Sequence, residues 1–78
     1  MNTKKTLVKA NALIKRINRK LAPMECQLRT ARTVNTELSV GKYFVVDVQQ
    51  NFIFRKYVDL EREGVRLGVL RPNEVLAA

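Results

Sequence analysis

The residues most able to do chemistry in this sequence are its lysines and arginines, 15 in number against seven Asp and Glu, which gives a net charge of +8. Cationic side chains bind phosphates and carboxylates, whereas proton transfer and metal binding need other groups. Histidine is absent and cysteine occurs once, at Cys26. These counts exclude a disulfide within the chain, a Cys/His zinc site and a His-based catalytic triad. We therefore expect a non-enzymatic binding protein with no cofactor and no metal.

The positive charge is concentrated in one half of the chain. Residues 1–36 contain nine basic residues and one acid, a net charge of +8, whereas residues 37–78 contain six of each. Such asymmetry favours a surface that binds polyanions. The candidate nucleic-acid or polyanion-binding residues are Lys5, Lys9, Lys15, Arg16, Arg19, Lys20, Arg29 and Arg32.

The carboxylates and glycines give no catalytic pattern. Glu61 and Glu63 are two residues apart, so on a helix they would point in different directions. The three glycines are too scattered to form a phosphate-binding loop. An enzymatic role is therefore not expected.

An amphipathic helix is predicted over about residues 4–22, before Pro23 ends it. Its apolar residues recur at intervals of three and four: Leu7, Ala10, Ile14, Ile17 and Leu21. The cations of this segment lie opposite, with no acid among them. The helix is thus predicted to present a wholly cationic face.

Three strands are predicted over about residues 25–33, 42–48 and 52–58, with residues 34–41 as a connection and 49–51 as a turn. In the second strand, Phe44 and Val46 share one face and Tyr43 and Val45 share the other. We expect Tyr43, Arg55 and Tyr57 on the outer sheet face, as a candidate stacking face for unpaired bases.

The C-terminal third, about residues 60–77, is predicted to be helical. Asp59 suits a helix N-cap, although residues 57–67 also fit a hairpin that turns at residues 61–64. We favour the helix because Glu61 and Glu63 suit its first turn, and we expect a last short helix with Pro72 at its first position. The predicted fold is a small, single α+β domain of α-β-β-β-α order, with a three-stranded antiparallel sheet and helices packed on one face.

This order resembles the topology of the double-stranded RNA-binding domain, and only the topology. That family places lysines at the start of its second helix, where this chain has the net acidic segment 59–63. No family is therefore assigned from the sequence.

The function that the sequence favours is contact with nucleic acid phosphates through the basic helix, with low sequence specificity and with DNA and RNA both open. The alternative is a protein-interaction module, regulator or inhibitor that binds an acidic protein surface or forms a homodimer, for example through its apolar C-terminal residues. A cationic helix lying on anionic lipid fits the charge but lacks a Trp or Phe to insert. No membrane span is expected, because the longest run of bulky apolar residues is 43–46, and the predicted location is cytoplasmic.

Overall fold

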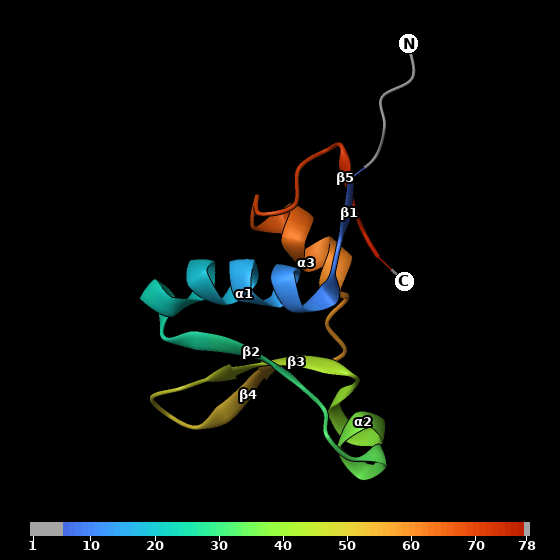
Figure 1. Ribbon diagram of the computed structural model, residues 1–78. Helices are drawn as coiled ribbons and strands as arrows, with labels where there is room; N and C mark the ends of the chain where they lie inside the picture. Colours follow the sequence, from blue (N-terminus) through green and yellow to red (C-terminus); the bar gives the residue numbers. More distant parts are fainter. Residues whose placement is uncertain (1–5, 78) are drawn as a thin grey trace.

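The computed structural model describes residues 6–77, which form two sheets and three α-helices (Figure 1). The elements in chain order are β1 (Thr6–Val8), α1 (Ala10–Leu21), the 3-10 turn η1 (Ala22–Met24), β2 (Cys26–Thr30), α2 (Val34–Val40), β3 (Tyr43–Asp47), β4 (Phe52–Arg55), α3 (Leu60–Arg66) and β5 (Glu74–Leu76). Strands β2, β3 and β4 form an antiparallel sheet in that order, and β1 pairs with β5 in a separate parallel sheet. The predicted α+β class and the three-stranded antiparallel sheet are confirmed.

Helix α1 lies across one face of the three-stranded sheet (Figure 1). Its residues Leu13 and Ile17 are fully buried, and they belong to the same core cluster as Leu28 of β2 and Val45 of β3. Leu28 and Val45 are register partners, so both side chains point to the α1 side of the sheet. Burial of this apolar stripe is what holds α1 on the sheet.

Helix α3 packs against α1, and both helices lie on the same side of the three-stranded sheet (Figure 1). The helices approach closely because Gly64 has no side chain: a Cβ there would lie 2.9 Å from Leu13 Cδ1. Asp59 begins α3, and its side chain accepts a hydrogen bond from the Arg62 backbone N–H at 3.0 Å. The helix favoured for this segment is confirmed, and the hairpin alternative is wrong.

The two ends of the described chain pair with each other, which corrects two expectations. Helix α1 begins at Ala10 rather than near residue 4, because Thr6–Val8 forms β1 against β5. Leu7 is consequently exposed and Leu13 occupies the core position instead. The last helix expected from Pro72 is also wrong: Glu74–Leu76 is strand β5, preceded by a turn in which the Glu74 N–H donates to the Arg71 carbonyl.

The connection expected over residues 34–41 is in part a helix, α2. The Thr33 hydroxyl caps its start by accepting a hydrogen bond from the Thr36 backbone N–H at 3.1 Å. Val40 is the only buried residue of α2. Helix α2 therefore has no buried apolar stripe at helical spacing. Gly41 ends the helix at φ 88°, a conformation that favours glycine.

The strands are shorter than predicted, most notably β4, which ends at Arg55 rather than near residue 58. Val45 pairs with Arg55 but Val46 pairs with Ile53, so Phe54 is an extra residue in a bulge. Tyr57 adopts a left-handed conformation at φ 52°, and its N–H donates to the Val40 carbonyl. The chain therefore leaves the sheet earlier than simple alternation indicates.

Candidate nucleic-acid interface

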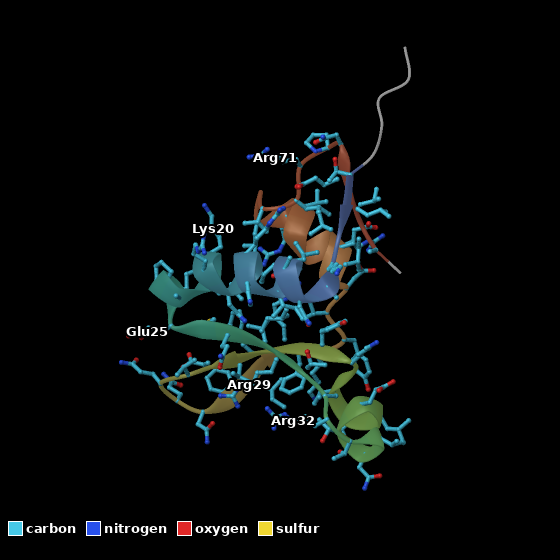
Figure 2. The ribbon with its side chains drawn as sticks, viewed as in Figure 1. Lys20, Glu25, Arg29, Arg32 and Arg71 are labelled. Carbon is cyan, nitrogen blue, oxygen red and sulfur yellow. The ribbon has the colours of Figure 1, made fainter. Side chains whose placement is uncertain are left out.

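The predicted cations lie on two opposite sides of the molecule and do not form one surface. In Figure 2, Lys20 projects from α1 away from the sheet, whereas Arg29 and Arg32 project from the other side of the sheet. The reason is strand alternation: Leu28 faces α1, so its neighbour Arg29 must face away. Lys5, also predicted for the patch, lies outside the described residues.

The first cationic surface is carried by α1 and by the segment after α3. We call it the helix surface and define it by Lys15, Arg19, Lys20 and Arg71, all exposed. Within residues 6–77 none of the four forms an ion pair. Lys9, at the N-cap of α1, is also exposed. Lys20 and Arg71 lie on the same side of the molecule in Figure 2.

Arg71 joins this surface at a cleft of about 350 Å³ between α1 and the segment that follows α3. The cleft is lined by Arg16, Arg19, Val69, Arg71 and Glu74. Sequence reasoning missed Arg71 because it lies in the half of the chain that has no net charge. Only the packing of the segment after α3 beside α1 brings it to the other cations.

Arg16 is held in an ion pair rather than free. Its Nη1 donates to Glu74 Oε1 at 2.9 Å and to the Val69 carbonyl at 3.2 Å. The backbone N–H of Arg71 and the Arg16 guanidinium both donate to the Glu74 carboxylate, and together they lower its pKa. Arg16 therefore anchors the C-terminal segment to α1 and neutralises the only acid in the cleft.

The second cationic surface lies on the face of the three-stranded sheet opposite α1. We call it the open sheet face and define it by Arg29, Arg32 and Phe44, which line a cleft of about 680 Å³ together with Gln27, Thr30 and Thr36. Arg29 and Phe44 are register partners on β2 and β3. The Arg29 Nε donates to Gln27 Oε1 at 3.1 Å. Among residues 6–77, no carboxylate lines this cleft.

Of the candidate stacking residues, Tyr43 and Arg55 do not lie on this open face, and Tyr57 is not among the residues that line its cleft. Tyr43 packs against the core, and Arg55 Nη1 donates to both carboxylate oxygens of Glu63, each at 2.8 Å. The Tyr57 hydroxyl donates toward the carbonyls of Leu38 and Ser39 in α2. The sequence correctly placed Phe44 and Val46 on one face of β3 and Tyr43 and Val45 on the other. Helix α1 covers the face of Tyr43 and Val45. Phe44 is thereby left on the open face.

Glu63 is the buried charged residue of the structure, with 2% of its surface exposed. Burial alone would raise its pKa, but hydrogen bonds and charge from Arg66 and Arg55 outweigh burial and lower it. The carboxylate links α3 to β4 and is fully used by these two arginines. Its role is structural, and nothing in the sequence pattern distinguished it from Glu61.

No match to this chain was found among protein-family models, curated proteins or solved structures. Among residues 6–77, no three side chains of the types that bind metals come together in a cluster that could hold an ion. In the same part of the chain, no helix is long and apolar enough to cross a membrane. The two cationic surfaces are therefore the features from which a function can be argued.

Proposed function

We propose that the protein binds the phosphates of nucleic acid through the helix surface, with low sequence specificity. The observation that supports this most is the exposed cluster of Lys15, Arg19, Lys20 and Arg71, to which separate parts of the chain contribute. Glu74, the one acid among the residues that line the cleft, is neutralised by Arg16. A polyanion approaching this cleft meets cations whose one neighbouring carboxylate is already paired.

The charge arrangement on α1 supports an anionic ligand. Lys15 and Arg19 are four residues apart on the exposed side of the helix, where like charges repel by a few tenths of a kcal/mol. A phosphate backbone would convert that repulsion into attraction. Contacts of this kind fix a protein on a backbone without reading bases, so discrimination among sequences would be weak.

Charge reversal on the helix surface tests this proposal. We expect Arg19→Glu/Lys20→Glu to abolish binding to a labelled duplex of about 20 base pairs at low salt. The matched control is Lys56→Glu/Arg62→Glu, which changes the net charge equally at exposed cations outside both surfaces. The control should lose only the small part of the binding free energy that comes from long-range electrostatic attraction. Its affinity should keep the wild-type dependence on salt.

Two results would contradict the proposal. One is that the wild-type protein binds no nucleic acid at low salt. The other is that the two double variants lose the same affinity, which would assign binding to net charge rather than to the helix surface. Circular dichroism of each variant shows whether the fold is retained.

Self-association is a second candidate function, and strand β4 supports it. β4 is an edge strand on which Phe52, Ile53 and Phe54 are all exposed, Phe54 by 59%. The opposite edge is protected, because Asn18 bonds both the N–H and the carbonyl of Leu28 in β2. An uncovered apolar edge strand is a site for pairing with another chain. Sedimentation at several concentrations of the wild type and of Ile53→Lys tests this candidate: a concentration-dependent dimer that the variant abolishes supports it, and a monomer throughout contradicts it.

An acidic protein surface is a further ligand that the helix surface would accept, since cations attract carboxylates as well as phosphates. Competition between a labelled duplex and poly-glutamate separates the two, because only a carboxylate-binding surface would favour the latter. For the location of the protein we propose the cytoplasm, in keeping with a chain whose one cysteine, Cys26, is free.

A further inference from the structure

We infer that the open sheet face binds single-stranded nucleic acid, with Phe44 stacking on an unpaired base and Arg29 and Arg32 holding the adjoining phosphates. This inference rests on the proposed function for the class of ligand, and it adds a second surface and a preference for unpaired strands. The helix surface lies on the other side of the molecule (Figure 2). Two different experiments can therefore test the two surfaces.

Arg29 and Phe44 are neighbours by register, which places their side chains together on the uncovered face. Directly opposed residues of an antiparallel pair have Cβ atoms about 5 Å apart. A base stacked on Phe44 would thus have its phosphate within reach of the long Arg29 side chain. Arg32 follows the end of β2 and lines the same cleft, and it projects on the same side as Arg29 in Figure 2.

The Arg29 guanidinium is held in place by one hydrogen bond that uses only one of its N–H groups. Its Nε bonds to Gln27 at 3.1 Å, whereas the terminal Nη groups have no bonded partner within residues 6–77. A guanidinium has five N–H donors in a fixed plane, so the terminal groups stay available for a bidentate bond to phosphate. Arg16 and Arg55 differ, because Glu74 and Glu63 already occupy them.

The lining of the cleft fits a nucleotide better than an apolar partner. Gln27, Thr30 and Thr36 contribute hydrogen-bonding groups, the two arginines contribute positive charge, and no carboxylate is present. Phe44 is the only aromatic ring among the lining residues. A ring flanked by cations and polar groups is the combination that binds single strands, because every base has a π-face.

The preference for a single strand follows from access to that π-face. In a duplex the base faces are stacked on one another, so Phe44 could reach none of them without unstacking the helix. An unpaired strand can turn its bases onto the sheet while its phosphates reach the arginines at the edge. The helix surface needs only phosphates and has no such preference.

Replacement of the Phe44 ring tests the inference. Phe44→Leu keeps an apolar side chain but removes the π-face, and we expect it to weaken binding of a labelled oligothymidine of about 12 nucleotides by about tenfold. Binding of a duplex should be unchanged. The matched control is Phe52→Leu: Phe52 is exposed on the same sheet, but it pairs with Asp47 and so belongs to the α1 side. This control should bind both probes as the wild type does.

A second variant keeps the inference testable if Phe44→Leu fails to fold. Arg29→Gln/Arg32→Gln changes two exposed side chains that make no ion pair in the described residues. We expect it to weaken oligothymidine binding and to reduce the salt dependence of log Kobs by about 0.7 for each phosphate that the variant no longer neutralises.

Four outcomes would overturn the inference. If Phe44→Leu folds and binds oligothymidine as tightly as the wild type, the ring does not stack on a base. If Phe44→Leu alters sedimentation but not binding, the face serves self-association instead. If Arg19→Glu/Lys20→Glu abolishes binding of both probes while Phe44→Leu and Arg29→Gln/Arg32→Gln leave oligothymidine binding unchanged, this inference fails and the proposed function stands; if no probe binds at all, both fail.

Discussion

Replacement of Glu63 by glutamine removes the charge from the one buried carboxylate among residues 6–77 while keeping its size. In the wild type this carboxylate accepts two hydrogen bonds from Arg55 Nη1, each 2.8 Å, and is further bonded by Arg66. The variant leaves two arginines facing a neutral amide that satisfies them only in part. We expect the free energy of unfolding to fall.

The size of the loss follows from how exposed the arginines are. Removing one partner from a fully buried ion pair costs about 3–5 kcal/mol. Here the side chains of Arg55 and Arg66 are 39% and 56% exposed, so water replaces part of what they lose. We therefore expect a loss of about 2 kcal/mol at pH 7, which for a chain of this length lowers Tm by about 10 °C. Urea unfolding followed by circular dichroism measures it.

The pKa of Glu63 gives this prediction a pH dependence. Because the folded-state pKa lies below the ordinary value of 4.5, the unfolded chain binds the proton more readily than the folded protein does. The stabilisation is therefore complete above about pH 4.5 and is lost as the pH falls through the folded-state pKa. The difference in stability between wild type and Glu63→Gln should be greatest at pH 7 and should narrow toward pH 3.

The control is Glu37→Gln, an exposed carboxylate on α2 that forms no ion pair within residues 6–77. It should change stability by less than about 0.5 kcal/mol at any pH. Equal stability of wild type and Glu63→Gln at pH 7 would refute the reasoning. A difference that stayed constant between pH 7 and pH 3 would show that the carboxylate charge is not its source.

Three further variants test two close contacts of the fold. Asn18→Ala removes the side-chain bonds at 2.7 and 3.3 Å to the edge of β2; we expect a loss of about 1–2 kcal/mol and faster exchange of the Leu28 amide hydrogen, and unchanged exchange would contradict the assigned bond. Gly41→Ala puts a Cβ 2.8 Å from Tyr57 Cα at φ 88°, so it should cost more than about 2 kcal/mol by urea unfolding. Gly68→Ala, at φ 73° in open space, should cost about 1 kcal/mol, and equal losses for the two alanines would show that the contact with Tyr57 does not matter.

The parts of the fold that the sequence predicts are those with local signals. The β3–β4 hairpin was predictable from its β-branched and aromatic residues, and α3 from the cap at Asp59. Helix α2 was not, because Val34 and Leu38 are exposed and provide no buried stripe. The local signals for α2 are only at its ends, where the Thr33 hydroxyl caps its start and Gly41 ends it.

The pairing of β1 with β5 has no local signal at all. Thr6 pairs with Glu74 across nearly the whole chain, and three-residue strands are too short to show alternation. The segment before Ala10 continues the apolar spacing of α1, so periodicity assigns Leu7 to the helix. Tertiary pairing overrides that local preference.

The candidate site was predictable only in part, because part of it depends on tertiary packing. Alternation correctly placed Phe44 and Val46 on one side of β3 and Tyr43 and Val45 on the other. It could not say which side α1 covers, since that depends on how the helix packs. Because α1 covers the face of Tyr43 and Val45, the candidate stacking residue is Phe44 rather than Tyr43. For the same reason Arg29 lies apart from the cations of α1.

The parallel pairing of β1 with β5 also determines how the molecule would respond to a pulling force. In a parallel pair, the chain enters β1 at Thr6 and leaves β5 at Leu76, at opposite ends of the two-stranded ribbon (Figure 1). Tension applied to the two ends therefore slides the strands past each other rather than peeling them apart. Bonds such as Thr6 N–H to the Asn73 carbonyl and Ala77 N–H to the Val8 carbonyl would share the load and break together. Strands β1 and β5 would thus act as a shear clamp, although each has only three residues.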